Sequence, residues 1–238
     1  MTSNDSDQHT PTAFIAGASR GLGHAMAAEL LDRGWHVIGT VRDITARTPL
    51  HELADSAGGR VSVEHLDINE PTHLAPLHER LADRQLDLLF VNAGTTNNTR
   101  TPIGSVPTGD FVEVMVTNAL SPMRVLEAFE DLVSPAGLIG VMSSGQGSIT
   151  NNTRGGGELY RASKAALNMF MRSFAVRQAE TDRAFVLMAP GWIRTGLGGP
   201  DARYTIEESI PLVVDVLLSR MGKPGLEYLD RFGQTVPW

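Results

Sequence analysis

Cysteine is absent from the 238-residue sequence. This absence excludes disulfides, thiolate nucleophiles and metal sites with cysteine ligands. Long apolar runs are also missing: no segment approaches the length needed to cross a bilayer, and residues 1–10 are polar and lack the apolar core of a signal peptide. We therefore expect a cytoplasmic protein without a membrane partner. A short disordered N-terminal tail, residues 1–10, is expected to precede one domain over residues 11–238.

Positive charge is scarce as well. The formal net charge is −7, which argues against a nucleic-acid-binding surface. The seven histidines show no metal-ligand spacing, so we expect no metal site. With 42% hydrophobic and 20% charged residues, the composition is typical of a soluble globular protein.

Short apolar runs alternate with helical patterns along the chain. Several runs are almost uniformly apolar, as expected for parallel strands covered on both faces. The repeated β-α-β alternation predicts a single α/β domain, with a doubly wound parallel sheet of about seven strands and helices on both faces. A proline, Pro211, is expected near the first turn of the last helix or at a kink in it. Residues 13–16, 36–41, 61–66, 86–91, 138–142 and 184–188 are the predicted strands, and residues 22–33, 71–84, 110–132, 159–180 and 206–218 are the predicted helices.

A glycine-rich turn follows the first predicted strand and opens the first predicted helix. Its spacing is G-x-x-x-G-x-G rather than the G-x-G-x-x-G of the general dinucleotide fingerprint. Glycines let the backbone turn sharply and approach a pyrophosphate, while the helix N-terminus supplies N–H donors. A plain strand-to-helix turn with small residues is the alternative, but the position in the chain favours a dinucleotide site. The turn residues are Gly17, Ala18, Ser19, Arg20, Gly21, Leu22 and Gly23.

Two arginines favour NADPH over NADH as the cofactor. Arg20 lies in the turn, and Arg42 follows the second strand, where an NAD-binding chain usually has an acidic residue for the ribose 2′-hydroxyl. A guanidinium matches a 2′-phosphate in charge and in fork geometry. The alternative is that Arg42 is a solvated loop residue and that Asp43 binds the ribose.

Tyr160 and Lys164 are spaced to lie one turn apart on the same helix face, downstream of the pair Ser143-Ser144. A nearby ammonium favours a phenolate, so we expect Lys164 to lower the pKa of Tyr160 and to make it a proton donor near neutral pH. Each residue alone has an ordinary explanation: a packed tyrosine, a solvated lysine or a serine in a turn. Together, behind a nucleotide-binding turn, they predict carbonyl/alcohol redox chemistry.

Several motifs follow one another in order and at specific intervals: Gly17-xxx-Gly21-x-Gly23, Leu66-Asp67-Ile68, Asn92-Ala93-Gly94, Asn118, Ser144, Tyr160-xxx-Lys164 and Pro190-Gly191-Trp192-Ile193-Arg194-Thr195. With these motifs the chain resembles the short-chain dehydrogenase/reductase family over nearly its whole length. The stretch Tyr160 to Asn168, the Gly-Gly-Pro that follows Thr195 and the terminal Pro237-Trp238 are similar to the carbonyl-reductase branch that includes sniffer-like and C-factor-like proteins. The resemblance implies a Rossmann-type domain.

The resemblance also implies individual roles. Asn118 would anchor a water in a proton relay toward Lys164, and Lys164 would also bind the nicotinamide ribose. It further implies a homodimer or tetramer packed through residues 110–132 and 159–180. The remaining implied cofactor contacts are Asp67 and Ile68 at the adenine, Asn92, Ala93 and Gly94 after the fourth strand, and Pro190, Gly191, Ile193 and Thr195 near the nicotinamide.

The chain departs from the family pattern at two places. Ala16 stands where the family usually has threonine, which removes a hydroxyl that ties the glycine turn to its surroundings. The interval from Ser144 to Tyr160 is longer than usual, and the extra residues fall in the loop at 145–158. Ser143 competes with Ser144 for the catalytic role, and the resemblance favours Ser144 because it places the active hydroxyl second in the pair.

The predicted function is therefore NADPH-dependent reduction of an aldehyde or ketone to an alcohol, with Tyr160 as general acid and Ser144 as hydrogen-bond donor to the developing oxyanion. The partner is a small carbonyl or alcohol substrate whose identity the sequence does not give. Two alternatives remain: an NAD-dependent alcohol dehydrogenase, and a dinucleotide-binding signalling protein with little turnover.

Overall fold

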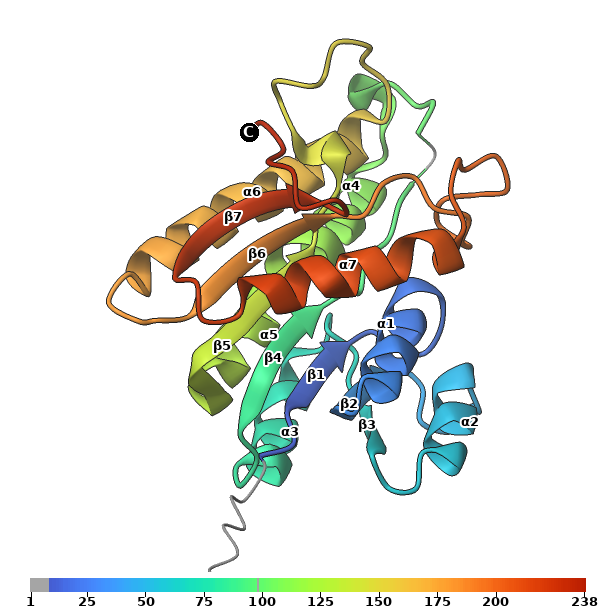
Figure 1. The fold of residues 1–238 in the computed structure, drawn as a ribbon. Coiled ribbons are helices and arrows are strands. Elements are labelled where there is room, and N and C mark those ends of the chain that lie inside the picture. Colours follow the sequence, from blue (N-terminus) through green and yellow to red (C-terminus); the bar gives the residue numbers. More distant parts are fainter. Residues whose placement is uncertain (1–8, 98) are drawn as a thin grey trace, which may run out of the picture.

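The chain folds around one parallel sheet, in a computed structural model that describes residues 9–97 and 99–238. Seven strands lie in the order β3-β2-β1-β4-β5-β6-β7, and every neighbouring pair is parallel. The predicted doubly wound α/β fold is confirmed (Figure 1). The strands are β1 (Thr12–Ala16), β2 (His36–Val41), β3 (Val61–His65), β4 (Leu86–Val91), β5 (Val133–Met142), β6 (Ala184–Ala189) and β7 (Gly225–Asp230).

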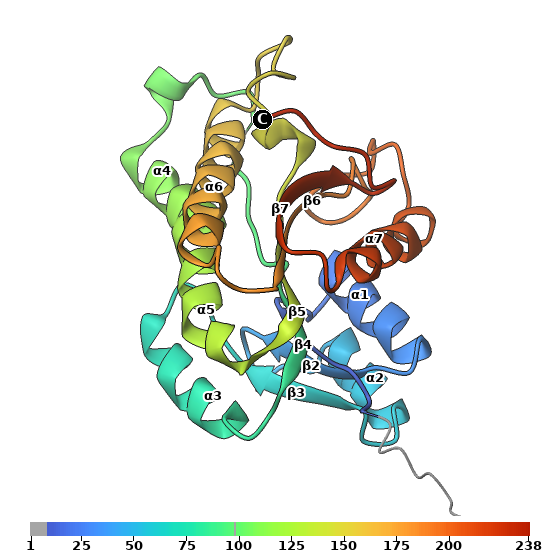
Figure 2. The same ribbon diagram turned by 60° about the vertical axis from the view of Figure 1, so that its left-hand side comes forward.

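Helices cover both faces of the sheet (Figure 2). The α-helices are α1 (Gly21–Asp32), α2 (Pro49–Ser56), α3 (Leu74–Leu81), α4 (Thr108–Met115), α5 (Ser121–Phe129), α6 (Glu158–Arg177) and α7 (Ile206–Arg220). A π-helical turn, η3 (Val116–Leu120), joins α4 to α5, and short 3₁₀ turns lie at η1 (Pro71–His73), η2 (Ile103–Ser105), η4 (Glu130–Leu132) and η5 (Gly145–Gly147). One apolar core lies between the sheet and α1, α2 and α7, and a second lies between the sheet and α3, α5 and α6.

All six predicted strands are present, but β7 was not predicted. Its sequence, GLEYLD, lacks the continuous apolar run of the inner strands because β7 pairs only with β6 and forms an edge of the sheet. The fifth strand begins at Val133, earlier than the predicted residue 138. An apolar run therefore marks the buried centre of a strand better than its exposed end.

The predicted helices differ from the observed ones in three respects. The single helix predicted over residues 110–132 is α4, the π turn η3 and α5 in succession. Helix α2 was missed because it is short and polar, although Thr48 and His51 form a capping box and Pro49 is the first helical residue. Helix α7 continues through Pro211, which lies beyond its first turn.

The N-terminal segment reaches the sheet at His9, whose Nε2 lies 2.9 Å from the Asp87 carboxylate. The expected disordered tail, residues 1–10, falls mostly outside the described part of the chain. No helix in the described part is long and apolar enough to cross a bilayer.

A buried threonine ties the end of β1 to β2. The Thr40 side chain is fully buried, and its hydroxyl accepts a hydrogen bond of 3.0 Å from the Gly17 N–H. The Thr40 carbonyl accepts a second one, of 2.9 Å, from the Ala18 N–H. On the other side, the Ala16 carbonyl accepts from the backbone N–H groups of Asn92 and Ala93. The turn is thus fastened on both sides even though Ala16 has no hydroxyl.

We expect Thr40→Val to lower the free energy of unfolding by ~1–3 kcal/mol, because the Gly17 N–H loses its partner in a partly buried position. Urea denaturation would measure the loss. Thr40→Ser is the matched control, because it keeps the hydroxyl and removes only a methyl group. A valine variant more stable than the serine variant would show that the hydroxyl tie is unimportant.

Candidate active site

The predicted site residues gather along one edge of the sheet, at the carboxyl ends of the strands. In sheets of this kind ligands bind at this edge. Three further residues reach it from helical segments: Asn118 from η3, and Tyr160 and Lys164 from α6. The strand-end positions are Gly17, Ser19, Arg20, Gly21, Leu22 and Gly23 after β1, Arg42 after β2, Asp67 and Ile68 after β3, Asn92, Ala93 and Gly94 after β4, Ser144 after β5, and Pro190, Gly191, Ile193 and Thr195 after β6.

The glycine turn has no room for side chains at two of its positions. Gly17 has φ +86°, and a Cβ there would lie 2.8 Å from the Ala93 Cβ. A Cβ on Gly23 would lie 2.1 Å from the Gly17 carbonyl oxygen. The same carbonyl accepts a 2.9 Å hydrogen bond from the Asn92 side-chain amide. The backbone is therefore closely packed and rigid, as a turn that approaches a pyrophosphate must be.

Helix α1 begins directly in this turn, and no side chain caps its N-terminus. Arg20 is the N-cap residue, in an extended conformation and without a side-chain cap hydrogen bond. The first N–H groups of an uncapped helix remain available as donors, and the helix dipole favours an anion beside them. The turn and the start of α1 thus fit the phosphates of a dinucleotide.

The two arginines predicted to bind a 2′-phosphate are exposed. Among the described residues, neither the Arg20 nor the Arg42 guanidinium has a hydrogen-bond or ion-pair partner. Asp43, the alternative ribose ligand, accepts hydrogen bonds from the Thr45 N–H (2.9 Å) and hydroxyl (2.6 Å). These bonds lower the pKa of Asp43. The Asp43 carboxylate is therefore already hydrogen-bonded to Thr45, while the neighbouring Arg42 guanidinium has no partner among the described residues.

Beyond β3, the segment predicted to flank the adenine is held by a local turn. The Asp67 carboxylate accepts a 2.9 Å hydrogen bond from the Asn69 N–H. Ile68 is buried. This leaves one polar and one apolar side chain next to each other at the strand end.

Asn118 is fully buried and joins the loop after β4 to α6. Its Oδ1 accepts from the Thr95 N–H at 2.8 Å, and its Nδ2 donates to the Thr95 carbonyl at 2.9 Å and to the Ser163 hydroxyl at 3.0 Å. The π turn η3 carries Asn118, and such turns occur frequently at functional sites. A Cβ on Gly94 would lie 3.3 Å from the Asn118 Oδ1 and 3.6 Å from the Lys164 Nζ. Asn118, Gly94 and the lysine amine therefore lie together.

The two serines after β5 have different partners. The Ser143 hydroxyl is buried and donates to the Asn168 Oδ1 at 2.6 Å. The Ser144 hydroxyl is hydrogen-bonded to Tyr160 and also accepts from the Gln146 N–H at 3.1 Å. Of the pair, Ser144 is thus the serine that meets the tyrosine.

Lys164 is buried, and its Nζ donates a 2.9 Å hydrogen bond to the Met142 carbonyl. The amine lies 5.9 Å from the centre of the Tyr160 ring. Burial lowers the pKa of Lys164 from 10.5 to about 8.

The structure contradicts the expected pKa direction for Tyr160. Burial raises the pKa of this phenol, and the Ser144 hydrogen bond is the one contact among the described residues that opposes the rise. The expectation that Lys164 would lower it is wrong for this arrangement, because the amine donates its hydrogen bond to the Met142 carbonyl and burial of the phenol dominates the shift. The phenol is therefore neutral, and keeps its proton, at neutral pH.

The segment after β6 folds back on itself. Gly191 has φ +96°, and Ile193 is buried and forms a bridge with Tyr204. The Thr195 hydroxyl accepts from the Gly198 N–H at 3.0 Å. The loop at 196–204 is thus held against the strand end from which it departs.

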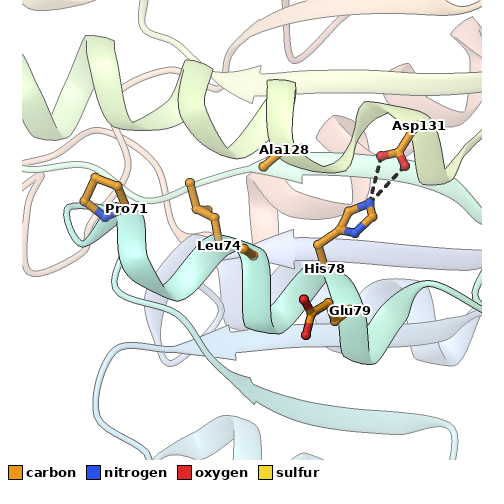
Figure 3. A pocket seen from close by; sticks show the side chains of 7 residues that line it. Pro71, Leu74, His78, Glu79, Ala128 and Asp131 are labelled. Carbon is orange, nitrogen blue, oxygen red and sulfur yellow. Dashed lines mark hydrogen bonds and ion pairs between the residues drawn. The ribbon is translucent and has the colours of Figure 1, made fainter.

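Two hollows in the surface of the described residues differ in their linings. The first, of about 470 Å³, lies between α3 and α5. Figure 3 shows His78 reaching across it to the Asp131 carboxylate, at 2.9 Å. None of the predicted site residues lines this hollow. A second hollow, of about 310 Å³, lies behind the Ser143–Ser144 segment, between Gly147, α6 and Trp238.

Several residues of the site were missed by sequence reasoning. Ser163 precedes Lys164 and holds Asn118, and Asn168 holds Ser143. Tyr228, on the unpredicted strand β7, donates to the Ser144 carbonyl. Ser163 and Asn168 lie within the helical stretch that carries Tyr160, so their spacing on that helix could have indicated a role in the site. No sequence pattern connects Tyr228 with the site.

Comparison with known proteins gives consistent matches. The sequence model of the short chain dehydrogenase family matches residues 11–203. A short-chain dehydrogenase/reductase of Burkholderia multivorans with bound NADP is 61% identical, with a TM-score of 0.95 over 97% of this chain and 100% of that chain. A carbonyl reductase of Pseudomonas aeruginosa PAO1 in complex with NADP is 32% identical, with a TM-score of 0.89 over 97% and 100% of the two chains. C-signal of Myxococcus xanthus is 34% identical over 155 residues, which are 64% of this chain and 93% of that protein.

We expect the burial of Lys164 to appear in the pH dependence of stability. The pKa of its amine is about 8 in the folded protein and 10.5 when unperturbed, so only the unfolded chain holds this proton between those values. The free energy of unfolding should therefore rise with pH from about 8 to 10.5, by on the order of 3 kcal/mol, relative to Lys164→Met. Denaturant titrations of both proteins across this range would measure the difference. A constant difference would contradict the lowered pKa.

Proposed function

Because the chain belongs to the short-chain dehydrogenase/reductase family, we propose that it reduces an aldehyde or ketone to an alcohol with NADPH. Its relatives include carbonyl reductases and the C-factor-like protein C-signal, and the chain is an NAD(P)-dependent oxidoreductase. The observation that carries the proposal is the hydrogen bond between Ser144 and a protonated Tyr160, next to the buried amine of Lys164.

In this proposal Tyr160 donates a proton to the carbonyl oxygen as negative charge develops on it, and Ser144 donates a hydrogen bond to the same oxygen. When bound, NADPH supplies the hydride. The pKa of Lys164, about 8, suits a group that exchanges a proton near neutral pH. Asn118 fixes the loop after β4 beside the amine and is the proposed anchor of the proton relay.

The cofactor preference rests on the free guanidinium groups. Arg42 and Arg20 would pair with the 2′-phosphate, and the uncapped start of α1 would hold the pyrophosphate. The NADP bound to the Burkholderia and Pseudomonas relatives supports this choice over NAD. The proposal keeps Asp67 and Ile68 at the adenine, Asn92, Ala93 and Gly94 along the cofactor, and Ile193 and Thr195 at the nicotinamide.

A signalling protein that binds a dinucleotide with little turnover is the second candidate. The similarity to C-signal favours it. The Ser144–Tyr160 hydrogen bond opposes it, because a pure sensor needs no proton donor.

We also propose a cytoplasmic homo-oligomer. Large apolar side chains are exposed on two neighbouring helical segments, and burying them against a second copy would remove apolar surface from water. These side chains are Phe111 and Val112 on α4, Leu120 on η3, and Met169, Phe170 and Val176 on α6.

We expect the wild-type protein to oxidise NADPH with at least one member of a panel of aldehydes, ketones and quinones. Tyr160→Phe should lower the rate by ~10²–10⁴-fold, because it removes the positioned acid. Its dissociation constant for NADPH, measured by fluorescence, should stay within a few-fold. A phenylalanine variant that keeps most of its activity would contradict the mechanism. Tight NADPH binding without oxidation across the panel would favour the signalling protein instead.

We expect Arg42→Ala to raise the KM for NADPH by ~10–100-fold, because a charge-assisted hydrogen bond to the 2′-phosphate contributes roughly 1.5–3 kcal/mol. The KM for NADH should change little. Steady-state kinetics with both cofactors would test this. Asp43→Asn is the matched control: a larger loss with NADH in this variant would mean that Asp43 binds the ribose and that the chain prefers NAD.

A further inference from the structure

Tyr228 places a buried hydroxyl directly behind the Ser143–Ser144 segment. The residue is 1% exposed and lies in β7, opposite Leu187 of β6. Its hydroxyl donates a hydrogen bond to the Ser144 carbonyl oxygen. It is also in hydrogen-bonding contact with the side chains of Ser143 and Asn168. Strands β5 and β7 and helix α6 therefore meet at this one hydroxyl.

The Ser144 peptide is held from two directions. Its carbonyl accepts from Tyr228 on one side and from the Gly147 N–H, at 2.8 Å, on the other. Ser144 is the extended N-cap residue of η5, and its own hydroxyl accepts from the Gln146 N–H. A shift of this peptide would therefore move the Ser144 hydroxyl relative to Tyr160.

A second layer of polar contacts supports the first. The Ser143 hydroxyl donates to the Asn168 Oδ1 at 2.6 Å, and the Asn168 Nδ2 donates to the Gly147 carbonyl at 3.4 Å. These bonds fix the residues on both sides of Ser144. The orientation of the Ser144 carbonyl itself depends on the hydrogen bonds that it accepts from the Gly147 N–H and the Tyr228 hydroxyl.

The end of the chain shields Tyr228 from water. The Trp238 ring lies 5.6 Å from the Tyr228 ring, and the Arg172 guanidinium lies 5.8 Å from the Trp238 ring. The Trp238 carbonyl accepts from the Thr150 N–H at 3.0 Å. Burial also raises the pKa of Tyr228. The phenol therefore keeps its proton and remains a donor over the whole neutral range.

We propose that Tyr228 is a positioning residue, whose hydroxyl fixes the Ser144 peptide and so directs the Ser144 hydroxyl toward Tyr160. The inference rests on the proposed function, in which Ser144 donates to the reacting oxygen. A phenylalanine would fill the same space beside Trp238, so packing alone does not require the hydroxyl. The hydroxyl adds the hydrogen bond to the Ser144 carbonyl and its polar contacts with Ser143 and Asn168.

The test compares Tyr228→Phe, Ser144→Ala and the double variant in NADPH oxidation with a carbonyl substrate. Loss of an oxyanion donor costs ~10²–10³-fold in kcat. We expect Tyr228→Phe alone to lower kcat by about tenfold, since the donor is misdirected rather than removed. The KM for NADPH should not change. In the Ser144→Ala background, Tyr228→Phe should change kcat by less than about twofold, because residues that act through each other are not additive.

Leu229→Val is the matched control. Leu229 follows Tyr228 in β7, is equally buried and belongs to the opposite core. It should lower Tm by a few degrees without lowering kcat. The same fall in kcat for this control, an equal effect of Tyr228→Phe in both backgrounds, or no effect at all would overturn the proposal.

Amide hydrogen exchange separates this inference from the proposed function. Tyr228→Phe should speed exchange at Gln146 and Gly147, whose N–H groups bond to Ser144, and Leu229→Val should not. If the wild-type protein reduces no carbonyl, the proposed function fails, and the exchange data still decide the positioning role. Unchanged exchange at these two amides would overturn it.

Discussion

A lysine amine buried without a carboxylate is the constraint around which the site is arranged. In the described part of the chain the Lys164 Nζ has a backbone carbonyl, that of Met142, as its hydrogen-bond partner, and no acidic side chain forms an ion pair with it. Burial of an unpaired charge is costly, so the pKa of the amine falls to about 8. A Cβ at Gly94 would lie 3.6 Å from the Lys164 Nζ, so any larger residue at this position would contact the amine. This unfavourable burial of the amine occurs at the carboxyl edge of the sheet, where ligands bind in this kind of fold.

Helix α6 carries this lysine and is anchored on two flanks by polar side chains. On one flank Ser163 bonds to Asn118, which in turn holds both backbone groups of Thr95. On the other flank Asn168 bonds to Ser143 and to the Gly147 carbonyl. The side chains of Asn118, Ser163, Asn168 and Ser143 are buried and hydrogen-bonded, which is the condition under which a polar network makes a structure more rigid. The tyrosine on the same helix therefore has a defined position relative to two loops that come from distant parts of the chain.

The features that could be predicted from the sequence are those with a local cause. Uniformly apolar runs indicated the inner strands. The glycine spacing indicated the turn after β1, which has no space for a side chain at Gly17 or Gly23. The edge strand β7 carries Glu227 and lacks such a run, so its residue Tyr228 could not be connected to Ser144. The π turn at Asn118 packs against α4, α5 and α6, and no short sequence pattern predicts such a turn. The direction of the Tyr160 pKa shift was wrong because sequence spacing gives proximity to Lys164 but not the degree of burial.

The raised pKa of Tyr160 changes which neighbour matters most to its acidity. A phenol that is protonated at neutral pH has a proton to donate, but it releases that proton less readily when burial disfavours the phenolate. Among the residues that the structure describes, Ser144 is the one whose hydroxyl opposes the effect of burial. The Ser144 hydroxyl has one hydrogen to donate, so in the proposed proton transfer it serves either the Tyr160 oxygen or the substrate oxygen at a given moment. The direction of the Ser144 hydroxyl therefore matters to this step, and the Ser144 backbone is the point at which the hydrogen bonds from β7 and η5 converge.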